Sequence, residues 1–486
     1  MKFEKAITVI QKSIWVLLLV ALPVTSFPLF PPAIGGEALV RPLALFPLII
    51  LVILVVIPKI IKKPIPRTVI LLIPFVLIAI ASSLLSLLRG IEPALGISAS
   101  ARVLRGIFTL GIGCAFYLVI ALVPDSREDL RFTMRWIYIG MCLAMLWASI
   151  QALFLIIFPN PDIFPYLEKA QRLISIRRLN PTRVAGMTYE PHWFAEQVLL
   201  LVIPWALASV MTGFSVFHNR WRRVTAEWFL LGWAILLIPF TFSRSGFLSL
   251  TVIIILGVYF FGPRNSHIKS KVSISVPTID QLISTAKRAM QFGIVIFGVL
   301  LPVYLIGSRN AFFSRLWEYW RNPNATIQGY ISQIAFDARQ VYGQAAYRTY
   351  LSYPILGVGL GNYAFYFEEM LPYKPIAEIP EVLLMITPEA GRDRLITAKN
   401  LYLRLMAETG IVGLIAFLAF LIGNLGCALY LWDSSDPEWR YWGTASFCGL
   451  IALILSAMTF DSFVIPNMWV IFGLITAATR VMLHSN

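Results

Sequence analysis

The stretch PLALFPLIILVILVVIPKII, residues 42–61, contains a single charged side chain, Lys59. Roughly 20 apolar residues in a helix cross the hydrocarbon core of a bilayer, so this stretch predicts a transmembrane helix. Similar runs recur along almost the whole chain, which has 486 residues, of which 58% are hydrophobic and 13% charged. This composition leaves too little polar surface for a water-soluble protein. We therefore expect one all-helical, integral membrane domain that covers residues 1–486.

The apolar runs predict about twelve transmembrane helices, which places both termini on one side of the membrane. The first run resembles a signal peptide but has no convincing cleavage site, so we expect a retained helix. Only residues 242–245 join the seventh and eighth runs, so one broken helix is the alternative to two crossings there. The predicted helices are 9–31, 42–61, 68–88, 103–123, 136–158, 192–214, 228–242, 246–262, 290–307, 410–432, 443–461 and 465–482.

Positive charge in the short loops predicts that both termini are cytoplasmic. The net charge of +15 is explained by these loops, and we expect no nucleic-acid partner. The four cysteines lie in apolar runs without metal-ligand spacing and are interpreted as packing residues. The basic residues of the inner loops are Lys59, Lys62, Lys63, Arg67, Arg127, Arg131, Arg220, Arg222, Arg223, Arg264, Lys269, Lys271, Lys287 and Arg288.

Three segments then face the outer side: residues 159–191, the turn at 243–245 and the stretch 308–400. The last one lies between the ninth and tenth predicted helices and is much longer than an ordinary connection. Its composition favours an ordered, partly helical loop, and such long ordered loops usually carry function.

This long loop should contain a helix that lies against the membrane domain. Apolar residues recur at helical spacing from Ile331 to Ala345. Pro354 disfavours a helical residue before it, so the helix should end near Ser352.

A first polar constellation precedes the helix that begins near Pro191. Arg183 and the free amide groups of that helix start would hold an anion such as a phosphate. Glu190 and His192 lie beside them, and His192 is the only histidine expected on the outer side. The alternative is an Arg–Glu pair that only anchors the helix.

A second constellation is the turn Thr241-Phe-Ser-Arg244-Ser-Gly246 between two apolar runs. An arginine at the edge of buried membrane elements usually faces a cavity or a polar partner, which makes Arg244 a functional candidate. The alternative is a surface turn in which Arg244 extends its charge into water.

A third constellation is RTYLSYPILGVGLGN, residues 348–362. No strand–helix–strand frame accompanies its glycines, so we interpret them as a bend after a helix, not as a dinucleotide loop. Arg348 remains a ligand candidate.

A fourth constellation begins at Lys399. Asn400, Arg404 and Glu408 are four residues apart and form one polar stripe, on which Arg404 can pair with Glu408. That pair alone leaves Lys399 and Asn400 unexplained.

The outer segments predict an anion site without a metal or other cofactor, because they contain no carboxylate pair or histidine cluster. They are rich in arginine, which keeps its charge when desolvated and holds two phosphate oxygens at once. These arginines are Arg102, Arg105, Arg172, Arg177, Arg178, Arg183, Arg244, Arg315, Arg321 and Arg348.

In this order and topology, the motifs resemble the O-antigen ligase and O-antigen polymerase family of bacterial envelope-glycan enzymes. The similarity covers about residues 180–415 by motif. Its elements are Arg183, Gly186 and Glu190-Pro191; Thr241, Ser243, Arg244 and Gly246; Arg348, Pro354, Gly357 and Gly359; and Asn400, Gly410 and Gly413.

The resemblance implies a multi-pass protein of the bacterial inner membrane, with the long loop in the periplasm. It implies a metal-independent glycosyltransferase that uses an undecaprenyl-diphosphate-linked glycan donor and a glycan or lipid acceptor. It also implies contact with membrane lipids and with other polysaccharide-assembly proteins. By resemblance Arg183, Arg244 and Arg348 bind the diphosphate, and Asn400 and Arg404 contribute to the substrate site.

The catalytic candidates are Lys399, His192 and Glu190. Ligases of the family carry a histidine directly before the position of Asn400, where this chain has Lys399. A protonated lysine cannot accept a proton, so Lys399 would bind phosphate while His192 or Glu190 serves as the base. Ligase and polymerase activity both stay open.

Two further alternatives are a transporter or flippase and a non-catalytic relative. Transporters tend to have two related halves with interrupted helices at matching positions. The halves of this chain look unlike each other, which favours the transferase.

Overall fold

The computed structural model describes residues 2–30, 38–62, 64–217, 220–221, 224–261, 297, 301, 304–308, 310–334, 336–372, 379–387 and 395–485. Most of these residues are helical, and the strands among them are the two-residue pair β1 (Arg220–Trp221) and β2 (Val224–Thr225). Within these described ranges, seven helices are long and apolar enough to cross a membrane. The chain is therefore a multi-pass, α-helical membrane protein.

The helices fall into a membrane group and an outer group. The membrane group consists of α1 (Lys2–Ala21), α2 (Leu45–Leu51), α3 (Ile57–Lys62), α4 (Arg67–Ser86), α5 (Ala99–Leu122), α6 (Arg127–Ala152), α8 (Pro191–Leu201), α9 (Ile203–Thr212), α10 (Ala226–Leu237), α11 (Arg244–Phe261), α18 (Leu401–Trp432), α19 (Pro437–Ser456) and α20 (Asn467–Ser485). The outer group consists of α7 (Phe164–Ile174), α13 (Ala311–Glu318), α14 (Ile327–Gln333), α15 (Asp337–Ser352), α16 (Tyr363–Tyr366) and α17 (Pro380–Ile386).

The seven long apolar helices all coincide with predicted runs, from Leu45–Lys62 to Asn467–Ser485. Three shorter apolar helices fall within the first, seventh and eighth runs, and α19 overlaps the run 443–461. Most of the run 290–307 lies outside the described residues. The count of twelve crossings therefore stays a prediction.

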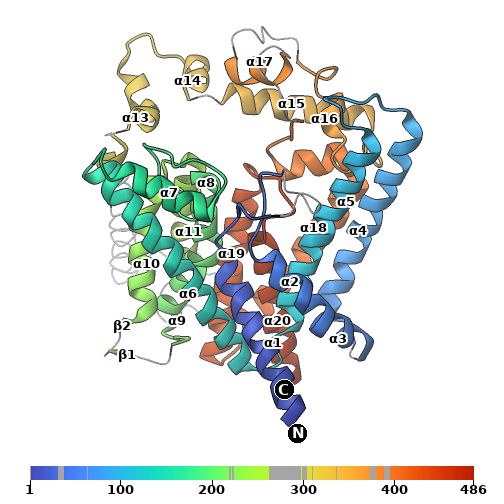
Figure 1. Ribbon diagram of the computed structural model, residues 1–486, viewed down its shortest axis with the longest axis vertical. Coiled ribbons are helices and arrows are strands. Elements are labelled where there is room, and N and C mark those ends of the chain that lie inside the picture. Colours follow the sequence, from blue (N-terminus) through green and yellow to red (C-terminus); the bar gives the residue numbers. More distant parts are fainter. Residues whose placement is uncertain are drawn as a thin grey trace, which may run out of the picture.

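The two ends of the molecule differ in what they carry (Figure 1). Both chain termini and the β1–β2 pair lie at the lower end, which we call the terminal end. The helices α13 to α17 lie at the opposite end, which we call the loop end. The termini thus share one end and the long loop occupies the other, as the run pattern predicts.

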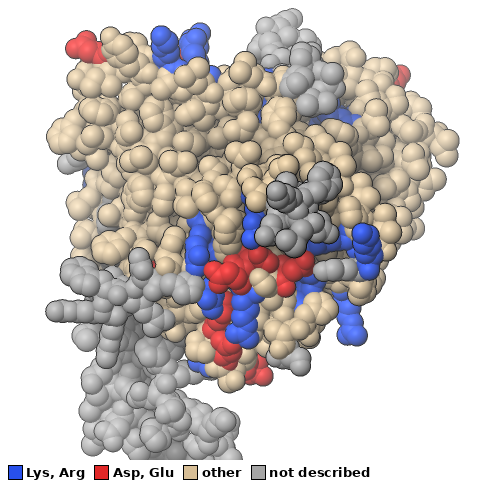
Figure 2. Space-filling model, turned by 60° about the horizontal axis from the view of Figure 1, so that its bottom comes forward, with Lys and Arg blue, Asp and Glu red and all other residues tan. Residues whose placement is uncertain are grey.

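Charged side chains gather at the terminal end, where Lys and Arg lie beside Asp and Glu (Figure 2). Arg127 bonds to Asp436 and Arg131 bonds to Glu438, so two predicted inner-loop arginines are paired across α6 and α19. The predicted basic residues Lys63, Arg222, Arg223, Arg264, Lys269, Lys271, Lys287 and Arg288 lie outside the described residues.

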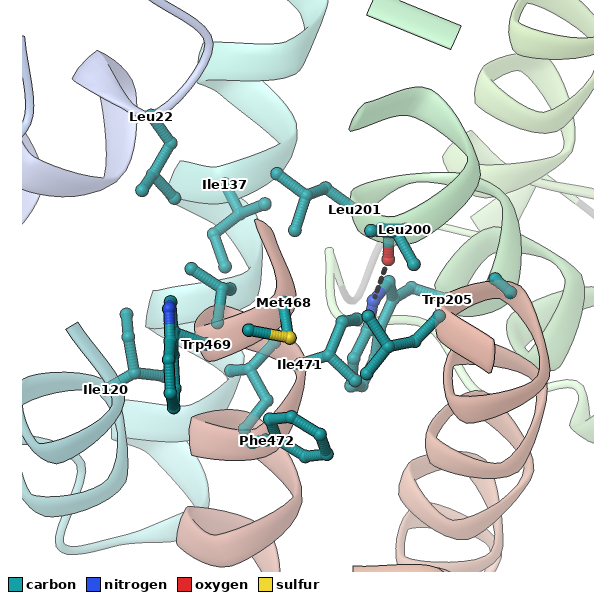
Figure 3. Close-up of a cluster of buried hydrophobic side chains, with 14 of the residues drawn as sticks. Leu22, Ile120, Ile137, Leu200, Leu201, Trp205, Met468, Trp469, Ile471 and Phe472 are labelled. Atoms are coloured by element: carbon teal, nitrogen blue, oxygen red, sulfur yellow. Dashed lines mark hydrogen bonds between the residues drawn. The ribbon is translucent and has the colours of Figure 1, made fainter. Parts of the chain in front are cut away.

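One part of the main core lies where α5, α6, α8, α9 and α20 meet (Figure 3). Trp205 is fully buried and its indole N–H donates to the carbonyl of Leu200 at 3.1 Å. Trp469 on α20 is also fully buried and faces Gly113 on α5, where a Cβ atom would lie 2.1 Å from the indole nitrogen. A glycine at this position lets α5 and α20 approach closely, as small residues do between membrane helices.

We expect Gly113→Ala to destabilise the fold by about 1–3 kcal/mol, because the added methyl group overpacks the contact with Trp469. Thermal unfolding in detergent should show a lower Tm. Gly111→Ala is the matched control, since a Cβ at Gly111 meets nothing within 4 Å. Equal Tm values for the two variants would contradict this account of the α5–α20 contact.

The predicted amphipathic helix is present as α15 and ends at Ser352, as expected from Pro354. Its buried residues Ala338, Val341 and Tyr342 form a second, smaller core with α16, α17 and α18. Its start differs from the prediction, because Ile331 belongs to the separate helix α14. The chain turns between the two helices, where the N–H of Phe336 donates to the carbonyl of Ile331. No glycine or proline marks this break in the sequence.

Candidate functional site

Arg183 joins the first two constellations at the loop end. Its Nε donates to the carbonyl of Thr241 at 3.0 Å and its Nη2 to that of Phe242 at 3.4 Å. Burial, followed by the charges of Arg177 and Arg244, lowers the pKa of Arg183 to about 10. Arg183 therefore fixes the backbone of the charged turn and adds a partly desolvated cation beside it.

The charged turn separates two helices and is not a kink in one. Phe242 adopts a left-handed conformation, with φ +46°. Ser243 then caps α11, because its hydroxyl oxygen accepts the N–H of Gly246 at 3.2 Å. Arg244 is consequently the first residue of α11, at the loop end.

Arg244 links the membrane domain to the outer loop. Its Nη1 donates to the carbonyl of Ile334, at the junction of α14 and α15. It also lies within electrostatic range of Arg315 and Arg339. A row of cations thus runs from Arg183 through Arg244 to α15.

Arg339, on α15, continues this row and was not among the predicted site residues. Its Nη1 is buried and has no hydrogen-bond partner among the described residues. Burial lowers the pKa of Arg339, and the nearby carboxylates of Glu381 and Asp461 only partly offset that effect. A buried guanidinium N–H without an acceptor costs free energy, which a hydrogen bond to an anion would offset.

Arg348 lies on the same helix but apart from this row. Its Nη1 donates to the carbonyl of Leu371 at 2.7 Å, and its side chain is exposed. It is nine residues from Arg339, about 13–14 Å along the helix axis. The structure does not bring Arg348 together with Arg183 and Arg244, and its ligand role stays a prediction.

Lys399 is held by two carboxylates. Its Nζ donates to Glu381 at 2.6 Å and lies 4.5 Å from the centre of the Tyr342 ring. Its backbone N–H donates to Asp461 at 2.9 Å, in a left-handed conformation with φ +50°. Lys399 is therefore a hydrogen-bond donor in this arrangement, not an acceptor.

Glu381 on α17 completes the contact with Lys399. The hydroxyl group of Tyr342 donates to the same carboxylate at 3.2 Å. Burial raises the pKa of Glu381, but the charge of Lys399 and the hydrogen bonds from Lys399 and Tyr342 outweigh it and lower the pKa overall. The carboxylate stays ionised at neutral pH and fixes the lysine ammonium.

His192 lies among the cations. It is half-buried near the start of α8 and lies within electrostatic range of Arg339, Arg183, Arg177 and Lys399. With Glu196, Ser245, Thr459 and other residues it lines a narrow cavity between α8, α11 and α19.

Glu190 is engaged differently from His192. Its carboxylate pairs with Arg177, whose guanidinium also lies 5.0 Å from the centre of the Tyr189 ring. The residue immediately precedes α8. Glu190 thus forms an anchoring ion pair, as the alternative interpretation of this motif describes, although with Arg177 in place of Arg183.

The fourth constellation is a capped and buried helix start. The side chain of Asn400 caps α18 by accepting the N–H of Leu403 at 3.1 Å. Arg404 pairs with Glu408 at 2.9 Å, as the spacing predicts, and also donates to the carbonyl of Asp461. Both side chains of the pair are almost fully buried. The charge of Arg404 is therefore largely compensated within the protein.

The glycines of the third constellation form a bend that packs against a break in α18. Gly410 has φ +65°, and a Cβ there would lie 2.2 Å from the carbonyl oxygen of Ile355. The N–H of Gly359 donates to the carbonyl of Glu408 and that of Ile411 to the carbonyl of Pro354, both at 2.8 Å. The bend thus supplies partners for backbone groups that the break leaves open.

Four functional candidates escaped the sequence reasoning: Arg339, Glu381, Asp461 and Glu196. Glu196 lies inside an apolar run and is only 6% exposed, and an ionisable residue in such a run is a recognisable signal. Asp461 gives a similar signal, because it is an ionisable residue at the end of the apolar run 443–461. Arg339 and Glu381 do not lie in apolar runs, so no such sequence signal distinguishes them from other charged residues of the long loop.

The assembled site combines a row of cations with a histidine and the ionised carboxylate of Glu381. Arg183, Arg244, Arg339 and Lys399 come from four separate segments, and each lies within electrostatic range of another or of His192. Such an arrangement suits a ligand that carries more than one negative charge.

Part of the chain is similar to a known protein family. Residues 229–418 match the family model described as O-antigen ligase. The matched segment runs from α10 into α18 and contains Arg244, Arg339, Arg348 and Lys399, whereas Arg183 and His192 precede it. No curated protein matches the chain. This segment is thus similar to the O-antigen ligase family, which the motifs of the chain also resemble.

Proposed function

We propose that this protein transfers glycan from an undecaprenyl-diphosphate-linked donor to a glycan or lipid acceptor, at the periplasmic face of the bacterial inner membrane. The observation that carries the proposal is the row formed by Arg183, Arg244, Arg339 and Lys399 at the loop end. The positive-inside pattern supports a periplasmic position for this end.

The cations suit the step in which the donor loses its glycan. The acceptor oxygen bonds to the anomeric carbon, and the bond from that carbon to the diphosphate oxygen breaks. The diphosphate keeps the electron pair, so negative charge grows on it in the transition state. Fixed cations in a water-poor site stabilise such charge without having to reorganise.

We assign the acceptor's proton to His192. A helix N-terminus favours the neutral imidazole, which is the form that accepts a proton. Glu190 is engaged by Arg177, and Lys399 donates to Glu381. Lys399 accordingly serves as a phosphate-binding cation held in place by Glu381.

The assay uses purified protein in lipid with a chelator, an undecaprenyl-diphosphate-linked oligosaccharide and an acceptor. We expect longer or transferred glycan, and the same product from Arg172→Gln, since Arg172 is exposed and pairs with Glu168. Donor that crosses a vesicle membrane without a change in its glycan would instead support the flippase alternative.

The role of Lys399 has its own test. Lys399→Arg keeps a cation and should retain most of the transfer rate, whereas Lys399→Gln should lower it by about tenfold or more. Initial rates at saturating donor give the comparison. If Lys399 were the proton acceptor, the arginine variant would be as inactive as the glutamine variant, because arginine does not deprotonate in proteins.

A further inference from the structure

A cavity of about 600 Å³ opens at the terminal end, away from the proposed transfer site. Its apolar walls include Val69 and Ile73 of α4 and Leu118 and Leu122 of α5. Its polar end is formed by Lys59, Asp125, Arg480 and His484. The volume lies in the range of specific ligand pockets, and the walls belong to helices that cross the membrane.

The polar end carries an excess of positive charge. Lys59 and Arg480 both bond to the carboxylate of Asp125, at 2.7 and 2.8 Å. Burial raises the pKa of Asp125, but hydrogen bonds from the two cations outweigh it and lower the pKa overall, so the carboxylate is ionised. Of the described residues that line this cavity, two cations and one carboxylate leave one positive charge. In the neighbouring cavity, Lys12 and Asp129 add one charge of each sign.

Arg480 has a donor that the described residues do not satisfy. Its Nη1 bonds to Asp125 and its Nη2 to the carbonyl of Pro124, whereas its Nε is buried without a hydrogen-bond partner among the described residues. The side chain is only 12% exposed. A buried charged donor without an acceptor costs free energy, so an anion from outside the chain would stabilise this end of the cavity.

We propose that this cavity binds one anionic phospholipid of the leaflet at the terminal end. An acyl chain lies along the apolar walls, and the phosphodiester accepts from Arg480, with His484 at the rim. The single excess charge matches one phosphodiester, while the ammonium group of a zwitterionic lipid is disfavoured. Exposed Lys62, at the end of α3, adds to the attraction for anionic headgroups. Inorganic phosphate alone would leave the apolar walls uncovered.

Native mass spectrometry of the full-length protein tests the proposal. The protein is released from mixed micelles that contain equal amounts of dioleoyl-phosphatidylglycerol and dioleoyl-phosphatidylcholine. We expect the wild type to retain one phosphatidylglycerol several-fold more often than phosphatidylcholine. Arg480→Gln and His484→Glu should remove this preference.

Arg440→Gln is the matched control. It removes one positive charge in the first turn of α19, where Arg440 is exposed and does not line the cavity. It should keep the preference for phosphatidylglycerol. Because Arg480 also binds the end of α5, Arg480→Gln can lose stability. The lipid preference of His484→Glu, a change at an exposed residue, then tests the proposal. Equal retention of both lipids by the wild type, or equal losses in His484→Glu and Arg440→Gln, would overturn the proposal.

Discussion

Replacing Arg339 by glutamine should lower the rate of glycan transfer by about 10²–10³-fold. The guanidinium lies on α15 within electrostatic range of Arg244 and His192, and its buried Nη1 has no hydrogen-bond partner in the part of the chain that the structure describes. Glutamine keeps a hydrogen-bond donor but removes the charge that would stabilise the leaving diphosphate. Initial rates of donor consumption, measured with purified protein at saturating donor, give the size of the effect.

Arg348→Gln is the matched comparison, because it makes the same change on the same helix. Arg348 donates to a loop carbonyl and is exposed, so we expect a smaller loss of rate than for Arg339→Gln. Tm values measured alongside separate loss of function from loss of fold. If Arg348→Gln lost more of the transfer rate than Arg339→Gln, Arg348 would be the residue that binds the diphosphate, as the motif resemblance alone implies.

The transmembrane helices could be predicted from sequence because the bilayer imposes a composition on each of them. About 20 apolar residues are needed for every crossing, and this requirement does not depend on what the helix packs against. The seven long apolar helices of the described residues therefore all overlap predicted runs, although Arg127–Ile157 and Leu401–Trp432 each begin nine residues before theirs. The proline rule fixed the end of α15 at Ser352 for a similar reason, since the clash is local.

Tertiary contacts within the site could not be predicted in this way. The backbone N–H of Lys399 donates to Asp461, which is 62 residues away in the sequence. The two residues are neighbours only because α18, α19 and the chain before α20 pack together. Arg183 likewise reaches Thr241 across 58 residues. The motif resemblance implies Arg348 of α15 as a diphosphate ligand, whereas the fold places Arg339 of the same helix near the other cations.

The second large effect concerns Arg404. We expect Arg404→Ala to destabilise the protein by about 3–5 kcal/mol, because the variant leaves the carboxylate of Glu408 buried without its partner. It also removes the donor to the carbonyl of Asp461 and the contact with the ring of Phe463. Thermal unfolding in detergent should show a markedly lower Tm and a lower yield of folded protein.

The double variant Arg404→Met/Glu408→Leu separates charge from packing. It removes both buried charges and keeps side chains of similar size, so much of the lost stability should return. Equal instability of the single and double variants would show that the ion pair is not the cause. If the double variant folds but transfers no glycan, Arg404 also binds substrate, as the family resemblance implies. A folded and active double variant would instead limit Arg404 to holding α18 against the chain before α20.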